Sequence, residues 1–177
     1  MDIFIEQLIK KESDTKLLLQ RIGIVVLVII LSLAAIFFGG LIAPLQSLIP
    51  LLVIAIIYGG WHLFGMTQLE YEYVITNGEI DIDKIIAQKK RTRICSFDGK
   101  NVEDVGKYKS DDHKNKSYGK IIKACINEND EKNTWYVVYK DPNFGNTLVL
   151  FSPNEKVLDA FKKSLPRQMQ VDVQLWN

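Results

Sequence analysis

The stretch Ile22-Gly-Ile-Val-Val-Leu-Val-Ile-Ile-Leu-Ser-Leu-Ala-Ala-Ile-Phe-Phe38 decides the fold, because it is uncharged and long enough to enter a bilayer. No Asp, Glu, Lys or Arg occurs from residue 22 to residue 69. That length is too great for one buried helix and suits two spans of about 20 residues. Since backbone amides in hydrocarbon must be satisfied within the segment, each span is expected to be helical. We therefore predict a two-helix transmembrane hairpin over residues 21–68, with spans at about 22–41 and 48–66.

Charged residues on either side of this stretch predict its orientation. Lysines and arginines precede the first span and follow the second, whereas the short link over residues 42–47 has none. The positive-inside rule then places both termini in the cytoplasm of a two-span protein of the cell membrane. A secretory signal peptide would have a shorter apolar run and a less acidic leader.

The interior of the hairpin predicts an anchor and not a transport path, because it holds no charged side chain. His62 lies at the end of the second span and is interpreted as an interfacial group. The pairs Gly39-Gly40 and Gly59-Gly60 are compatible with close approach of the two helices.

Residues 1–20 are predicted to form an amphipathic cytoplasmic leader. Ile5, Leu8 and Ile9 stand at helical spacing, so we expect a short helix over residues 1–12. Three interpretations stay open: the helix lies in the membrane interface, docks onto the rest of the protein, or frays.

From residue 69 the pattern changes from continuous to alternating hydrophobicity, which is typical of half-buried strands. Asn77-Gly78 between two such runs is a strong hairpin signal. A helix over residues 155–165 is expected after Ser152-Pro-Asn154, and Pro166 should end it. Expected strands, in antiparallel order, cover residues 71–76, 80–86, 91–97, 121–126, 135–140 and 147–151.

Three further segments of this region have weaker patterns. Val102 and Val105 predict a brief turn or short helix, and the polar residues 107–119 predict a mobile loop. Residues 169–175 alternate as a last strand would.

Strands followed by one helix resemble pleckstrin-homology-like (PH-like) domains, in which a helix caps a small, bent antiparallel sheet or partly open barrel. Three phrases also resemble small bacterial membrane proteins with a two-helix hairpin and a bacterial PH-like domain: Tyr73-Val-Ile-Thr-Asn-Gly-Glu-Ile-Asp-Ile-Asp83, Lys89-Lys-Arg-Thr-Arg-Ile94 and Ser152-Pro-Asn-Glu-Lys-Val-Leu158. The resemblance covers about residues 20–166. It implies an α+β membrane protein with a cytoplasmic PH-like domain over residues 69–177, and it implies no reaction. The seventh strand of that fold should lie near Val102–Val105 or come from the terminus.

The basic run Lys89, Lys90, Arg91 and Arg93 is the candidate site. Near a membrane, clustered lysines and arginines attract anionic lipid headgroups. Two other interpretations compete: the run only fixes the topology, or its arginines form cross-strand ion pairs. One register of the predicted hairpin places Asp83 opposite Arg91 and Asp81 opposite Arg93.

Catalytic and metal chemistry find little support in the sequence. Ser110-Asp-Asp-His113 holds triad residue types, but neighbours in a flexible loop do not assemble triad geometry. No cofactor motif or metal-ligand spacing occurs, and Cys95 and Cys125 are interpreted as free, buried thiols. A net charge of +1 gives no reason to expect a nucleic-acid partner.

We therefore expect a non-enzymatic, membrane-tethered interaction module whose partners are the lipid bilayer, anionic headgroups and an unidentified protein. The alternative is an accessory subunit of a larger transport or secretion complex. An enzyme is the third and least supported hypothesis.

Overall fold

The structure is a computed structural model that describes residues 4–174. It divides into two compact units, one formed by Ser13–Gln68 and the other by Met1–Glu12 together with Leu69–Asn177. We call the first the hairpin unit and the second the β unit.

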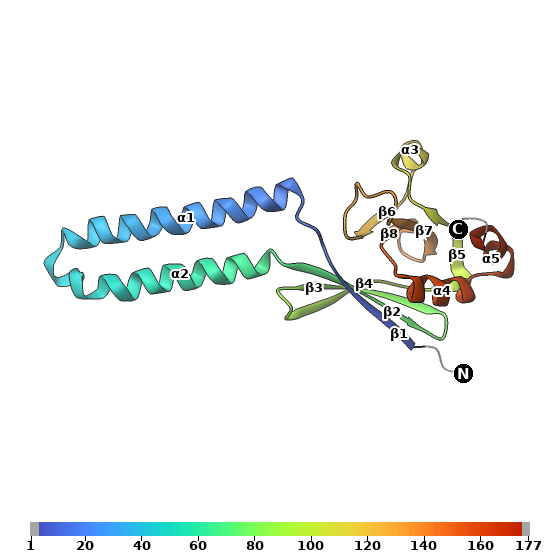
Figure 1. Cartoon of the computed structure of the whole chain (residues 1–177), viewed down its shortest axis with the longest axis horizontal. Helices are drawn as coiled ribbons and strands as arrows, with labels where there is room; N and C mark the ends of the chain where they lie inside the picture. Colours follow the sequence, from blue (N-terminus) through green and yellow to red (C-terminus); the bar gives the residue numbers. More distant parts are fainter. Residues whose placement is uncertain (1–3, 175–177) are drawn as a thin grey trace. The chain divides into compact units, whose positions relative to one another are not determined.

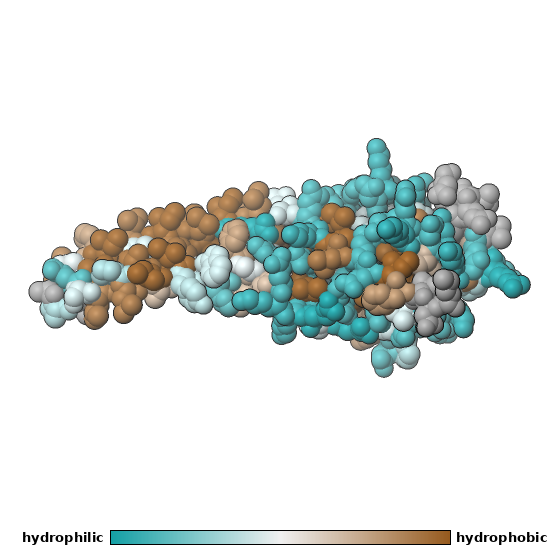
Figure 2. Space-filling view, turned by 60° about the horizontal axis from the view of Figure 1, so that its bottom comes forward, coloured by the Kyte–Doolittle hydropathy of each residue, from teal (hydrophilic) through white to brown (hydrophobic). Residues whose placement is uncertain are grey.

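The hairpin unit consists of two helices that lie side by side (Figure 1). Helix α1 covers Thr15–Gly40, a 3₁₀ turn covers Ala43–Leu48, and helix α2 covers Ile49–Met66. Asp14 caps α1 because its carboxylate accepts the Thr15 N–H at 2.7 Å. Both helices are long and apolar enough to cross a membrane. Figure 2 shows apolar side chains over most of the visible surface of this unit.

Two of the glycines let these helices approach each other. A methyl group on Gly60 would overlap the side chain of Val28 on α1, and one on Gly39 would lie 2.8 Å from Ile49 Cγ1. Gly40 and Gly59 have no neighbour within 4 Å of that position. The predicted close approach is therefore confirmed for one glycine of each pair.

Sheet A of the β unit contains four antiparallel strands in the order β1-β2-β3-β4 (Figure 1). Their bounds are Phe4–Lys10, Leu69–Thr76, Glu79–Ile86 and Lys90–Asp98. The predicted helix over residues 1–12 is wrong, because β1 pairs along its whole length with β2. Ile5 and Ile9 point to the core with Gln7 between them, so the same residues satisfy a period of two as well as a helical one.

The hairpin unit is inserted at the position of a β-turn. Lys10 pairs with Glu70 at the end of the β1–β2 ladder, and the Lys11 N–H donates to the Leu69 carbonyl at 2.9 Å. An ordinary hairpin would join these strands by a few residues. Residues 1–12 of the predicted leader and the domain predicted over residues 69–177 therefore form one folded unit, whereas residues 13–20 of that leader belong to the hairpin unit.

Sheet B has the order β5-β7-β8-β6, with bounds Val102–Lys107, Trp135–Asp141, Gly145–Phe151 and Lys120–Ala124. Strand β5 occupies the place proposed for the seventh strand, so the turn or short helix expected there is wrong. The expected antiparallel order is also wrong at one edge, because β6 pairs with β8 in parallel. Residues 4–174 thus form two open sheets in place of the single small antiparallel sheet or partly open barrel that was predicted.

Helix α4, Glu155–Ser164, confirms the predicted helix, and Asn154 caps it by accepting the Val157 N–H at 2.9 Å. The last strand predicted at residues 169–175 is wrong where the structure describes it, because helix α5 covers Arg167–Gln174. Pro166 begins the new turn, since its carbonyl accepts the Met169 and Gln170 N–H groups. The segment 107–119 is also more ordered than a polar loop, with a short helix α3 at Ser110–His113.

The core lies between the two sheets and α4. Phe97 of sheet A stacks on Tyr139 of sheet B with ring centroids 4.4 Å apart. Phe151 contacts Tyr73 and Phe161 edge to face. The buried Tyr73 hydroxyl donates to the Ala124 carbonyl and accepts the Ser152 N–H, so its polar atom is satisfied between the sheets.

Candidate functional site

The turn between β3 and β4 presents the predicted basic run. Ala87 and Gln88 occupy the left-handed region, with φ of 53° and 56°. Two such residues make the tight hairpin turn whose twist matches the strands, and the Lys89 N–H closes it on the Ile86 carbonyl at 3.1 Å. The position of the lysines is therefore fixed by strand pairing.

This turn lies at the end of sheet A where the chain leaves for the hairpin unit and returns from it. Leu69, the first residue of β2, pairs with Ile86, the last residue of β3. Strand β1 ends at this same end of the sheet, at Lys10. Only residues 67 and 68 separate α2 from β2, and three chain steps reach at most about 11 Å. We call this end of sheet A the basic end.

The two arginines of the run form ion pairs within sheet A. Arg91 Nη2 lies 2.6 Å from Glu72 Oε1 on β2. Arg93 contacts both aspartates of β3, with Nη1 at 2.8 Å from Asp81 and Nε at 3.0 Å from Asp83. The hydrogen bond to Asp83 raises the pKa of the Arg93 guanidinium.

The predicted pairing of these residues was right in kind and wrong in register. Asp83 pairs with Arg93, not with Arg91, because the ladder shifts after Ile82 and leaves Ile94 without a partner. This β-bulge moves Arg91 opposite Ile85, from which its side chain reaches β2.

The lysines of the basic end have no such partners. Within residues 4–174, the ammonium groups of Lys84, Lys89 and Lys90 make no ion pair or hydrogen bond. Lys89 and Lys90 are exposed and Lys84 is half-buried. The structure therefore separates the run into arginines that hold the sheet together and lysines that are available to another molecule.

A sequence profile of the bacterial PH-like domain family (DUF6106) matches residues 1–171. The chain belongs to this family. The match covers both the hairpin unit and the β unit, so it confirms the resemblance inferred from the three sequence phrases. No curated protein and no solved structure matches the chain.

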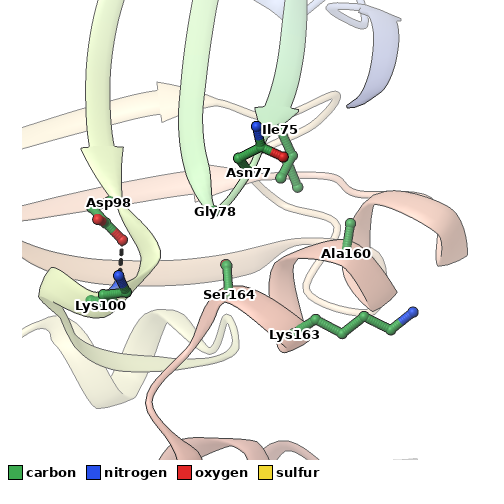
Figure 3. A pocket seen from close by; sticks show the side chains of 8 residues that line it. All are labelled: Ile75, Asn77, Gly78, Asp98, Lys100, Ala160, Lys163 and Ser164. Atoms are coloured by element: carbon green, nitrogen blue, oxygen red, sulfur yellow. Dashed lines mark hydrogen bonds between the residues drawn. The ribbon is translucent and has the colours of Figure 1, made fainter. Parts of the chain in front are cut away.

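A hollow of about 310 Å³ lies at the opposite end of sheet A of this PH-like protein, beside the β2–β3 turn (Figure 3). Small residues of the turn and of α4 leave the space, among them Gly78, Ala160 and Ser164. Figure 3 shows the Lys163 side chain pointing away from the hollow. The Asp98 carboxylate accepts the Lys100 N–H at 2.9 Å. The hollow thus shows no converging set of polar groups.

The residues Ser110 to His113 do not assemble a triad. His113 is buried, its Nδ1 lies 2.7 Å from the Tyr118 hydroxyl, and its ring packs against Tyr108 and Tyr136. Burial lowers the pKa of His113, which favours the neutral imidazole. This aromatic cluster was not predicted, because alternation and spacing do not indicate that a residue of a polar segment folds back onto a sheet.

Metal and thiol chemistry gain no support from the described part of the chain. Residues 4–174 contain no group of three His, Cys, Asp or Glu side chains placed to hold a metal ion. Both cysteines are free and buried, as predicted. Burial raises the pKa of Cys95 to about 12 and that of Cys125 to about 11, so neither is an activated nucleophile.

Proposed function

We propose that this PH-like protein is a non-enzymatic, membrane-tethered interaction module. The hairpin unit anchors the chain, the β unit lies at the cytoplasmic face, and the lysines of the basic end meet anionic headgroups. The observation that carries this proposal is the coincidence of three features at one end of sheet A: both junctions with the hairpin unit, the tight β3–β4 turn, and three lysines without an ion pair among residues 4–174.

The dimensions of the hairpin unit support its role as an anchor. Helix α2 has 18 residues and therefore extends about 27 Å, close to the ~30 Å hydrocarbon core of a bilayer. The uncharged part of α1 after Arg21 is of similar length. Arg21 itself is held at the ends of both helices, donating to Thr67 Oγ1 at 3.0 Å and to Ser13 Oγ at 2.7 Å. These polar contacts suit the boundary between hydrocarbon and headgroups.

The electrostatics of the basic end support a lipid contact. A lysine near an anionic surface gains about 1 kcal/mol, and the effect decays within a Debye length of about 8 Å at physiological salt. The short connection through residues 67 and 68 keeps the start of β2 within about 11 Å of the end of α2, a distance comparable with the Debye length. Lys84, Lys89 and Lys90 would therefore contribute about 3 kcal/mol together if all three approach the surface.

Labelling of single cysteines tests the tether and its orientation. Gln46→Cys lies in the link between the helices and Gln88→Cys in the β3–β4 turn. The native thiols are buried and serve as an internal blank. A membrane-impermeant maleimide should label Gln88→Cys only in inside-out vesicles and Gln46→Cys only in right-side-out vesicles. Labelling of both sites from one side, or release of the protein by alkaline carbonate, would contradict the proposal.

A further inference from the structure

The face of sheet A that points away from the core carries an unusual set of side chains. Because paired residues of an antiparallel sheet point to the same side, the register defines this face as a series of rows. We call it the outer face of sheet A. Its three central rows are Lys10-Glu70-Ile85-Arg91, Leu8-Glu72-Asp83-Arg93 and Glu6-Val74-Asp81-Ser96.

These rows hold five carboxylates and three cations, so the outer face has an excess of negative charge. Three of the carboxylates are almost inaccessible: Glu70 is 5% exposed, Glu72 is 2% exposed and Asp83 is 4% exposed. Burying a carboxylate is costly unless every oxygen has a donor. The arginines donate hydrogen bonds to only some of the oxygens of these carboxylates.

Among residues 4–174, two buried carboxylate oxygens on this face find no hydrogen-bond donor, Glu72 Oε2 and Asp81 Oδ1. Glu72 Oε1 is bound by Arg91, and Asp81 Oδ2 by Arg93, so each carboxylate is satisfied on one side only. Burial raises the pKa of Glu72, and a side-chain hydrogen bond with the neighbouring Glu6 carboxyl raises it further. The two carboxyl groups share a proton when Glu72 is protonated, and when both are ionised a cationic donor is the group that would satisfy both.

Apolar side chains accompany the unsatisfied carboxylates. Leu8, in the row of Glu72, is 51% exposed, and Phe4, two rows further along the outer face, is 65% exposed. Exposed apolar side chains surrounded by polar groups are a feature of surfaces that bind protein.

We infer that the outer face of sheet A is a docking surface for a basic segment of a partner protein, which carries arginine or lysine beside apolar residues. The cation would enter between Glu6 and Glu72, and the apolar side chains would cover Leu8 and Phe4. A guanidinium has enough donors to bridge two carboxylates, whereas a metal ion would leave the apolar residues uncovered. An anionic membrane is repelled by this face. The inference deepens the proposed role as an interaction module by naming the chemistry of the partner.

Fluorescence anisotropy with the full chain in a zwitterionic detergent tests this inference. Detergent removes any dependence on bilayer insertion, so a failure here is separate from a failure of the proposed tether. The probe is a labelled peptide of arginine and leucine, compared with one of arginine and serine and one of glutamate and leucine. We expect the arginine–leucine peptide to bind most tightly and the Glu6→Gln/Glu72→Gln variant to bind it at least tenfold more weakly.

Two further variants keep the test decisive. Glu6→Lys places an ammonium beside Glu72 from an exposed position, so it should raise the melting temperature of the protein and abolish binding of the probe. Glu103→Gln/Asp159→Asn removes two exposed carboxylates elsewhere on the β unit and should leave binding unchanged. Equal loss of binding in both double variants, equal binding of all three peptides, or no binding by the wild-type protein would overturn the inference.

Discussion

Replacing the hairpin unit by a two-residue turn should convert the protein into a soluble, folded β unit. The structure pairs Lys11 with Leu69 through a backbone hydrogen bond, so Asn-Gly between these two residues would continue the β1–β2 ladder as an ordinary hairpin. Deletion of residues 12–68 removes the apolar helices and leaves every strand of both sheets in place. This grafted protein should be monomeric and should unfold in one cooperative transition.

The matched control is the fragment 69–177, which lacks β1. Its loss exposes the edge of β2 and removes Ile9, which is 6% exposed, and the half-buried Ile5. Full burial of an isoleucine is worth about 1.5–3 kcal/mol and half-burial about half as much, so this loss alone is about 2–4.5 kcal/mol. Since domains of this size are stable by only about 5–15 kcal/mol, the fragment should be largely unfolded or aggregated.

Size-exclusion chromatography and urea unfolding followed by near-UV circular dichroism distinguish the two proteins. We expect a monomer with a cooperative transition for the graft, and a transition at much lower urea, or none, for the fragment. Equal stability of the two proteins would show that β1 is not an integral strand of sheet A, and would refute the insertion of the hairpin unit at a β-turn.

Three further predictions follow from other parts of the structure. Alkylation of Cys95 and Cys125 at about pH 8 should be at least a hundredfold slower in the folded protein than in guanidinium, because their raised pKa values suppress the thiolate. Rapid alkylation of the folded protein would refute their burial. Because the pKa of His113 is lowered, the free energy of unfolding should fall as the pH drops below about 6.5, by up to about 1.4 kcal/mol per pH unit. In urea unfolding, the His113→Gln variant should lack this part of the pH dependence. Identical pH profiles of the variant and the wild-type protein would contradict the prediction. Gly60→Ala should lower stability in detergent by about 1–3 kcal/mol, because the added methyl group overlaps α1. Gly59→Ala should have little effect, and equal effects of the two substitutions would contradict the close packing of the two helices at Gly60.

Local patterns in the sequence predicted most of sheet A and the helix α4. Strands β2 and β3 follow from clean alternation on both sides of Asn77-Gly78, and Asn77 adopts the left-handed conformation that such a turn requires. The two long helices follow from an uninterrupted apolar run. In each case the signal lies within one segment, so distant parts of the chain are not needed to interpret it.

Strand β1 could not be recognised from its own residues. Ile5, Leu8 and Ile9 fit a helical spacing, and the decision in favour of a strand comes from pairing with β2, which lies beyond the whole hairpin unit. The outer face of sheet A was missed for the same reason. Glu6 and Glu72 are far apart in sequence, and only the register brings them into neighbouring rows.

The strand register at the arginines is a second feature that local sequence patterns do not predict. A single unpaired residue, Ile94, changes which aspartate faces Arg93 and sends Arg91 across to β2. Bulges of this kind depend on how two strands twist against the rest of the core, which alternation alone does not indicate. The distinction between structural arginines and available lysines therefore follows from the three-dimensional structure and not from the local sequence pattern.

Headgroup quenching of a fluorophore at Gln88→Cys tests whether the basic end meets a bilayer. The full chain is reconstituted with lipids that carry a nitroxide on the headgroup, in zwitterionic or anionic membranes. Asn101→Cys is the control, because it follows β4, whose nine residues place it about 30 Å along the sheet from the basic end. Our account predicts strong quenching at residue 88 in anionic membranes, which weakens in high salt and in Lys84→Gln/Lys89→Gln/Lys90→Gln, and weak quenching at residue 101. Equal quenching at both positions, or quenching at residue 88 that does not depend on anionic lipid or on the lysines, would contradict it.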